Sequence, residues 1–142
     1  MRISVNCPSY KRPKVETLKY LPFCKVWVCE TEAEAYRQAN PGFEENIIPC
    51  KKGIQGNVCR IRNHILDTEF SSGADVVVII DDDMKHTAYY ESEPGNPFGY
   101  KRQYVKTEDF LPFVERYSRL CAEFGFKLWG LNCNKDARSY SQ

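Results

Sequence analysis

The chain has 142 residues, of which 42% are hydrophobic and 27% charged, and its formal net charge is +1. This composition is typical of a soluble globular protein, and the length predicts a single domain over residues 1–142 with a core of its own. No stretch approaches the roughly 20 apolar residues that a membrane span needs. The near-neutral charge, with no long run of one sign, excludes a protein that coats nucleic acid along its whole surface.

The seven cysteines indicate where the protein functions. Four of them stand in apolar, strand-like stretches, namely Cys7, Cys24, Cys29 and Cys50. The absence of a Cys-x-x-Cys pair, and of a His near any close pair of cysteines, argues against a structural zinc site. We therefore expect reduced, buried thiols and, because the N-terminus does not read as a signal peptide, a cytoplasmic protein.

The first half of the chain alternates between strand patterns and helix patterns. Strands are expected over residues 3–7, 25–29 and 46–50, and helices over residues 13–20, 32–38 and 58–70. Pro13 suits the first position of its helix because proline needs no N–H there. This alternation is typical of βαβ units, so the fold class predicted is α/β, with three α/β/α layers around a mainly parallel, Rossmann-like sheet.

Residues 74–84 contain the most distinctive pattern, in which five β-branched residues run directly into Asp81, Asp82 and Asp83. An unbroken β-branched run predicts a strand buried on both faces. The three acids then fall at its carboxyl end, where open α/β sheets bind ligands. Three adjacent carboxylates repel one another unless a cation offsets them, and Asp is a good ligand for Mg²⁺ or Mn²⁺. One interpretation is a metal site for a phosphate-bearing substrate, and the other is a solvated acidic turn.

Two basic loops follow the first and the third of the expected strands. The first, residues 8–13, contains Lys11 and Arg12 and leads into a helix, whose start attracts anions. The second, residues 51–57, has two glycines and two lysines and is followed by Arg60 and Arg62. Such a loop suits a diphosphate but is not a P-loop, because the Gly-Lys-Ser/Thr ending is missing. Solvated surface charges are the alternative for both segments.

The rest of the chain has fewer chemical signals. Residues 85–100 predict an irregular excursion or a hairpin, in which His86 is a candidate metal ligand near Asp83, although a lone His is more often a surface residue. Apolar residues at helical spacing predict an amphipathic helix from Thr107 to Phe124, with its aromatic stripe in the core. Residues 127–132 predict a last strand.

Taken in order, these segments resemble the nucleotide-binding half of the GT-A glycosyltransferases, above all the large inverting family whose members open with a strand, Pro-Thr-Tyr and Asn-Arg. The resemblance covers about residues 1–90 and, more weakly, residues 127–132. Within that superfamily, the chain also looks like the small glycosyltransferases of phages and of DNA-modification systems. The resemblance implies metal-dependent transfer of a sugar from a nucleoside-diphosphate sugar, a UDP-sugar above all, to a hydroxyl acceptor such as a modified DNA base.

The resemblance also implies how the nucleotide is bound. Glu30, at the end of the second strand, would face the base, where the family usually has Asp. The nucleotide would pass along the loop that contains Pro8, Ser9, Tyr10 and Arg12. Arg62 would reach the phosphates, as in the family's Ala-Arg-Asn segment, although Ile61 replaces the Ala here.

The metal site follows from the same resemblance, since Asp81 and Asp83 match the family's Asp-x-Asp motif. Asp81 would hold the ribose or the metal, and Asp83 would ligate the Mn²⁺ or Mg²⁺ ion that bridges the diphosphate. Such an ion offsets the charge that develops on the leaving nucleoside diphosphate. Asp82, between them, is expected to be structural or to support the metal ligands.

The chain departs from the family in two respects. Family members are usually longer, with a second half that supplies an Asp or Glu base, and many have a late His ligand, whereas no His follows His86 and the only late acid is Asp136. We therefore expect a truncated piece, a minimal enzyme or a donor-binding domain, and we assign no catalytic base. A nucleotidyltransferase that uses the same acids, and a module without catalytic activity, are the alternatives.

Overall fold

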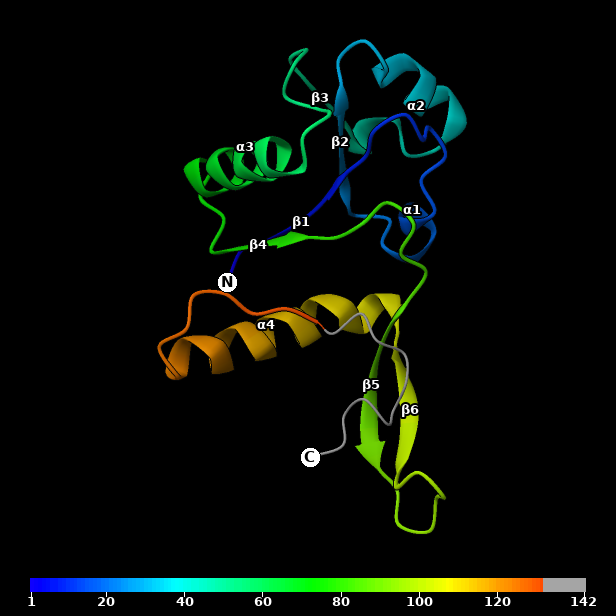
Figure 1. The fold of residues 1–142 in the computed structure, drawn as a ribbon, viewed down its shortest axis with the longest axis vertical. Coiled ribbons are helices and arrows are strands. Elements are labelled where there is room, and N and C mark those ends of the chain that lie inside the picture. Colours follow the sequence, from blue (N-terminus) through cyan, green and yellow to red (C-terminus); the bar gives the residue numbers. More distant parts are fainter. Residues whose placement is uncertain (132–142) are drawn as a thin grey trace. The chain divides into compact units, whose positions relative to one another are not determined.

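The computed structural model describes residues 1–131, and the chain divides into two compact units, Met1–Lys85 and a second that begins at His86. The first unit is built on a parallel sheet in the order β3-β2-β1-β4 (Figure 1). Its strands are β1 (Ile3–Pro8), β2 (Lys25–Cys29), β3 (Ile47–Cys50) and β4 (Val76–Ile79). Every pairing in this sheet is parallel, which confirms the α/β class and the mainly parallel sheet.

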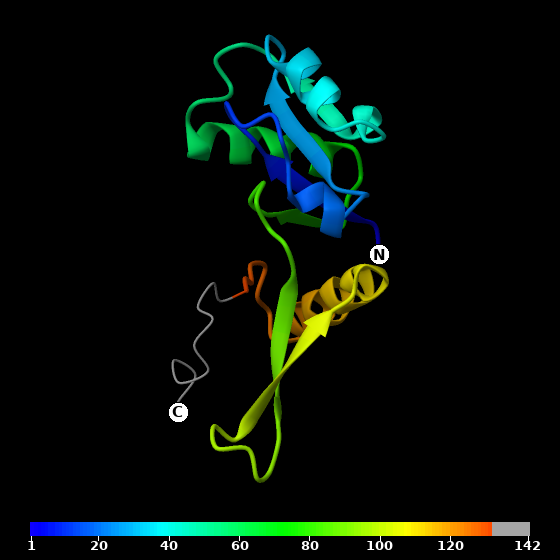
Figure 2. The same ribbon diagram turned by 90° about the vertical axis from the view of Figure 1, so that its right-hand side faces the viewer.

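Helices flank this sheet and connect its strands (Figures 1 and 2). They are α1 (Thr17–Tyr20), α2 (Ala33–Ala39), the short 3₁₀ helix η1 (Glu44–Asn46) and α3 (Val58–Ser71). The predicted helix over residues 13–20 is therefore wrong for its first half. Residues 13–15 are instead held by Asn40, which donates to the carbonyl of Pro13 at 2.6 Å and accepts from the N–H of Val15 at 3.1 Å.

Strand β4 differs from its prediction in one respect. The β-branched run does form a strand, but Val76 to Ile79 are half-buried, so burial on both faces is not observed. The reason is the sheet order, in which β4 lies at the edge and pairs only with β1 among residues 1–131. The core lies around β1 and β2 instead, where Val5, Val26 and Val28 are at most 3% exposed.

The predicted buried cysteines are confirmed, since Cys7, Cys24, Cys29 and Cys50 are buried free thiols. A hydrogen bond with Cys24, together with burial, raises the pKa of the Cys7 thiol. A thiol that stays protonated and buried packs as a small apolar side chain and is a poor nucleophile.

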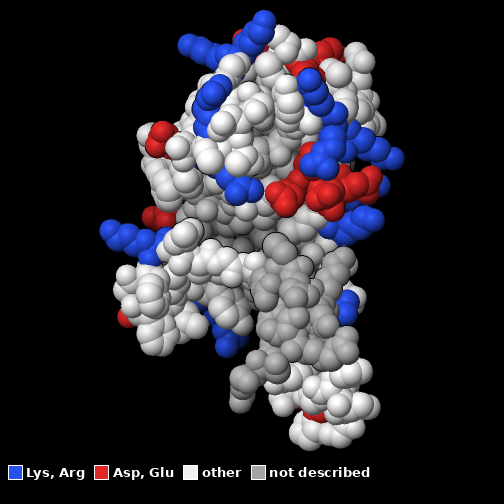
Figure 3. Space-filling model, in the orientation of Figure 1, with Lys and Arg blue, Asp and Glu red and all other residues white. Residues whose placement is uncertain are grey.

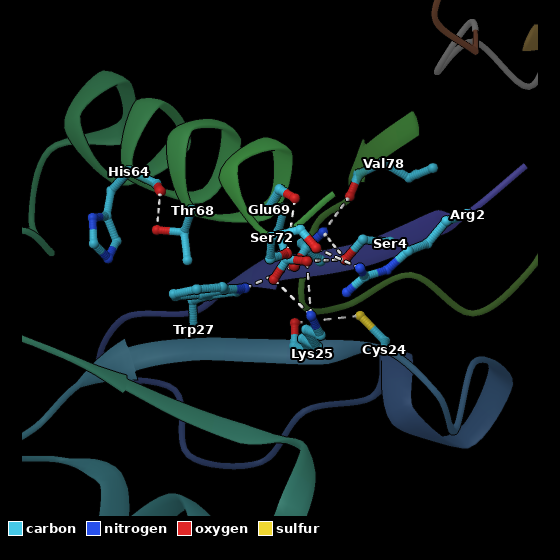
Figure 4. A network of polar contacts seen from close by, with 11 residues as sticks. Arg2, Ser4, Cys24, Lys25, Trp27, His64, Thr68, Glu69, Ser72 and Val78 are labelled. Atoms are coloured by element: carbon cyan, nitrogen blue, oxygen red, sulfur yellow. Dashed lines mark hydrogen bonds and ion pairs between the residues drawn. The ribbon is translucent and has the colours of Figure 1, made fainter. Parts of the chain in front are cut away.

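A buried polar network fixes α3 to the sheet (Figure 4). The carboxylate of Glu69 accepts a hydrogen bond from the hydroxyl of Ser4 at 2.7 Å and from the ammonium group of Lys25 at 2.7 Å and 2.8 Å. The amide of Asn6 donates to Ser4 and accepts from the indole N–H of Trp27. Because each buried polar group has a partner, the network joins α3, β1 and β2 without an unpaired charge.

We predict that Glu69→Gln destabilises the protein by about 2–3 kcal/mol at neutral pH, because Lys25 loses its charged partner. Burial alone would raise the pKa of Glu69, but the hydrogen bonds from Lys25 and Ser4 outweigh it and lower the pKa below its ordinary value. A carboxyl group with a lowered folded-state pKa stabilises the fold above its unfolded pKa of about 4.3, and this contribution is lost as the pH falls through the folded pKa.

Urea denaturation followed by circular dichroism at neutral and at acid pH measures both effects. The difference in unfolding free energy between the wild type and Glu69→Gln should shrink as the pH falls below the unfolded pKa of Glu. Glu45→Gln is the control, because Glu45 is exposed. A difference that stays constant down to acid pH would contradict the role of the Glu69 charge.

The second unit consists of a β-hairpin and a helix. Strands β5 (Thr87–Ser92) and β6 (Tyr100–Val105) pair antiparallel, so the hairpin is the correct alternative of the two predicted for residues 85–100, although its second strand extends beyond that range to Val105. Helix α4 (Thr107–Glu123) matches the predicted amphipathic helix. Among the described residues, no helix is long and apolar enough to cross a membrane.

Two predictions for the second unit are wrong. Phe110 and Val114 are buried, but Tyr117, Leu120 and Phe124 of the same stripe are exposed, so the stripe is core only in its first half. No strand forms over residues 127–131, and Asn132, the end of that predicted strand, lies outside the described residues. This segment instead turns back onto α4, where the indole N–H of Trp129 donates to the hydroxyl of Ser118 at 3.0 Å.

Candidate functional site

The carboxyl ends of the parallel strands meet at one edge of the first unit, and hydrogen bonds tie the following loops together there. The carbonyl oxygen of Trp27 accepts from the N–H of Ser9 at 3.0 Å and from the side-chain amide of Gln55 at 2.6 Å. The N–H of Glu30 donates to the carbonyl of Cys50 at 2.9 Å. The two basic loops of the sequence are thus neighbours at the edge where α/β sheets bind ligands.

The acidic turn that follows β4 is held by Thr17, the first residue of α1. The Thr17 hydroxyl donates to the carbonyl of Asp81 at 2.7 Å and accepts from the N–H of Met84 at 2.9 Å. The backbone N–H of Thr17 donates to the carbonyl of Asp82 at 3.2 Å. These bonds fix the backbone from which all three carboxylates project. The sequence does not indicate this role of Thr17, since its partners are more than 60 residues away and no local pattern marks it.

Asp82 is buried and joins the acidic turn to the first loop. Its carboxylate accepts a hydrogen bond from the Ser9 hydroxyl at 2.6 Å and lies 2.5 Å from the Arg12 guanidinium. The phenol oxygen of Tyr36 lies 2.9 Å from the Ser9 hydroxyl and accepts from the N–H of Arg12 at 3.1 Å. Burial raises the pKa of Tyr36, so the phenol stays neutral beside the Asp82 charge. Asp82 therefore has a structural role.

Asp81 and Asp83, in contrast, point into solvent, with side chains 74% and 68% exposed. Each lies near an arginine from another element: Arg62 of α3 is 3.8 Å from Asp81, and Arg12 of the first loop is 3.8 Å from Asp83. Figure 3 shows acidic side chains gathered among basic ones on this face of the first unit. Exposed pairs at this separation add little stability, so Asp81, Asp83 and Arg62 can exchange these partners for a ligand at low cost. Arg12 differs from Arg62, because its guanidinium is also 2.5 Å from the buried carboxylate of Asp82.

Glu30 and Tyr10 border the glycine-containing loop from two sides. Glu30 is exposed, and its carboxylate accepts from the backbone N–H of Lys52 at 2.9 Å. The ring of Tyr10 lies beside Gly56 and is 45% exposed, with the ammonium group of Lys11 5.1 Å from its centre. A half-exposed ring at this edge is a surface on which a planar base can stack. Pro8, the remaining residue predicted here, ends β1.

The two arginines at the start of α3 have different roles. Asn57 caps the helix by accepting from the N–H of Arg60 at 2.9 Å, and the guanidinium of Arg60 donates to the carbonyl of Gly53. Arg60 thereby closes the loop on itself, whereas Arg62, 47% exposed, extends toward Asp81. Of the two, Arg62 is the residue that can reach a ligand beside the acids.

Asp81 and Asp83 are the two exposed carboxylates of the acidic turn, and their chemistry is that of ligands for a divalent cation. Within residues 1–131 no group of three or more His, Cys, Asp or Glu side chains is positioned to hold a metal ion. Mg²⁺ is typically bound by one or two carboxylates together with substrate phosphates and water, and two exposed acids beside two arginines suit that arrangement. His86, the other candidate ligand, belongs to the second unit, where its ring packs edge-on against Tyr104 with centroids 4.8 Å apart.

Comparisons of the chain with models of protein families, with curated proteins and with solved structures found no match. A functional assignment therefore depends on the residues of this site and on their chemistry. The feature on which it depends most is the convergence of Arg12, Arg62, Asp81 and Asp83 from three separate segments of the chain.

Proposed function

We propose that the first unit binds the diphosphate of a nucleotide sugar through a Mn²⁺ or Mg²⁺ ion held by Asp81 and Asp83, and that the protein is a metal-dependent glycosyltransferase. The supporting observation is that two arginines from separate loops lie 3.8 Å from these two exposed carboxylates at the carboxyl edge of a parallel sheet. We also propose that this sheet is the Rossmann-like core of a GT-A fold, with a UDP-sugar as the donor.

The charges at this edge suit both a cation and a diphosphate. A divalent ion between Asp81 and Asp83 would offset their repulsion and, when bound, would stabilise the charge on the leaving diphosphate. Arg62 would then turn from Asp81 toward the phosphate oxygens, since guanidinium groups bind phosphate with paired hydrogen bonds. Arg12 would keep its contact with Asp82 and offer its remaining N–H groups to the phosphates.

The nucleoside would lie along the neighbouring loops. Tyr10 offers the face of a ring to the base, and Glu30 offers a carboxylate oxygen to an N–H or hydroxyl group. The bond from the N–H of Lys52 to Glu30, 2.9 Å long, holds that carboxylate in place before any ligand arrives. The acceptor is a hydroxyl compound, and no residue is assigned as the base that deprotonates it.

The reaction products distinguish this proposal from its alternatives. Incubation with UDP-sugars and Mn²⁺ should release UDP slowly even without an acceptor, because water can take the place of the acceptor hydroxyl. Release should stop when the metal is chelated and should be lost in Asp83→Asn. Pyrophosphate release from a nucleoside triphosphate with a sugar phosphate would instead identify a nucleotidyltransferase and would contradict the proposal.

A further inference from the structure

Helix α4 and its C-cap residue Phe124 carry an apolar seam, which we define as Phe113, Tyr117, Leu120 and Phe124. These residues follow one another at intervals of four, three and four, the spacing by which paired helices bury one side against each other. Tyr117 is 39% exposed, Leu120 45% and Phe124 71%. A row of large apolar side chains left in solvent marks an interaction surface.

Another side of the same helix is already covered. After α4 the chain turns back along the helix (Figure 1), and the N–H of Phe126 donates to the carbonyl of Cys121 at 2.9 Å. Trp129 donates to the Ser118 hydroxyl, and Val114 and Ser118 are buried. Trp129 also borders the seam, with its ring 6.0 Å from that of Tyr117, but Leu120 and Phe124 stay exposed beyond it.

The charges beside the seam are self-complementary. Arg116 and Glu123 are both exposed and stand seven residues apart, close to two full helical turns, so both lie along the same flank of the helix, beside Tyr117 and Phe124. Arg119 and Glu115 pair with each other at 2.6 Å away from the seam, whereas no ion pair is found for Arg116 or Glu123 within residues 1–131. One flank of the seam thus carries a positive charge, that of Arg116, toward one end and a negative charge, that of Glu123, toward the other.

We propose that α4 pairs antiparallel with α4 of a second copy of this chain, around a two-fold axis that crosses the seam between Tyr117 and Leu120. In this arrangement Tyr117 faces Leu120 of the partner subunit, and Phe113 faces Phe124 of the partner subunit. Arg116 meets Glu123 of the partner subunit, and two-fold symmetry forms every contact twice. A parallel pair would not bring these charges together, so the charge pattern favours the antiparallel dimer. This surface belongs to the second unit and does not depend on the proposed nucleotide site.

Sedimentation equilibrium across about a hundredfold range of protein concentration measures this association. The average mass of the wild type should rise from 16.5 kDa toward twice that value. Leu120→Glu, which places a charge in the seam, should stay monomeric while its circular dichroism spectrum remains that of the wild type. The matched control is Leu128→Glu, because Leu128 is 89% exposed and lies outside the helix, and it should dimerise normally.

Charge exchange tests the orientation of the two helices. Arg116→Glu and Glu123→Arg should each weaken the dimer by about tenfold, because two attractive pairs become two repulsive ones. The double variant Arg116→Glu/Glu123→Arg should restore the wild-type affinity. A wild type that is monomeric at every concentration, or a double variant that is no better than the single ones, would overturn the proposal.

Discussion

Replacing Asp83 with alanine should abolish the Mn²⁺-dependent binding of UDP and leave the first unit folded. The carboxylate is 68% exposed and lies 3.8 Å from the Arg12 guanidinium, so the fold loses almost nothing. The proposed metal site, in contrast, loses one of its two protein ligands. Because changes to groups that merely support a metal ligand already cost 10–100-fold in affinity, we expect a loss of at least about 100-fold, measured by titration calorimetry with saturating Mn²⁺.

Asp67→Ala is the matched control for this experiment. Asp67 is an exposed residue of α3 in the same unit, and its replacement makes the same change in net charge. It should leave the dissociation constant of UDP unchanged. If Asp83→Ala binds UDP with Mn²⁺ as tightly as Asp67→Ala does, Asp83 is not a metal ligand.

Replacing the neighbouring Asp82 with alanine should have the opposite effect and destabilise the protein by about 2–4 kcal/mol. Asp82 is 3% exposed, and it accepts a 2.6 Å hydrogen bond from the Ser9 hydroxyl and contacts Arg12. Its removal leaves a buried hydroxyl without its acceptor and separates the first loop from the acidic turn. Urea denaturation followed by circular dichroism measures the change in unfolding free energy.

The two variants Asp82→Ala and Asp83→Ala form a matched pair in one turn of the backbone. Asp83→Ala should unfold at the urea concentration of the wild type, whereas Asp82→Ala should unfold well below it. Equal stability of the two variants would show that the buried hydrogen bonds of Asp82 contribute little to the fold.

Local patterns were sufficient to predict most of the first unit. The strand over residues 25–29 and the helix that begins at Val58 have the predicted starts, because a short apolar run and helical spacing are properties of neighbouring residues. The helix over residues 13–20 failed because Asn40, far along the chain, binds the backbone of Pro13 and Val15. A distant side chain of this kind leaves no signal in the local sequence.

Burial was harder to predict than secondary structure. The apolar run of β4 resembles a central strand, but its burial depends on which strands lie beside it, and in the sheet it lies at an edge. The apolar stripe of α4 likewise has the sequence pattern of a buried helix face, although only its first half is covered. Hydrophobic spacing shows which side of an element is apolar, but the tertiary structure determines what covers that side.

The order of strands and loops along the chain predicts which segments meet at the candidate site. Segments that follow parallel strands meet at one edge, so the grouping of Arg12, Arg62, Asp81 and Asp83 could be expected before the structure was known. The distinct roles of the three acids depend on burial and on Thr17, Ser9 and Tyr36, whose contacts span more than 20 residues.

A thermal-shift panel of nucleoside diphosphates and triphosphates, each with and without Mn²⁺, tests the central claim most directly. We expect that one nucleoside diphosphate, UDP above all, raises the melting temperature only when Mn²⁺ is present. A ligand at a hundred times its dissociation constant adds about 2.7 kcal/mol of stability, which such an assay detects easily. If no nucleotide shifts the melting temperature in the presence of Mn²⁺, the proposed nucleotide-sugar site is contradicted.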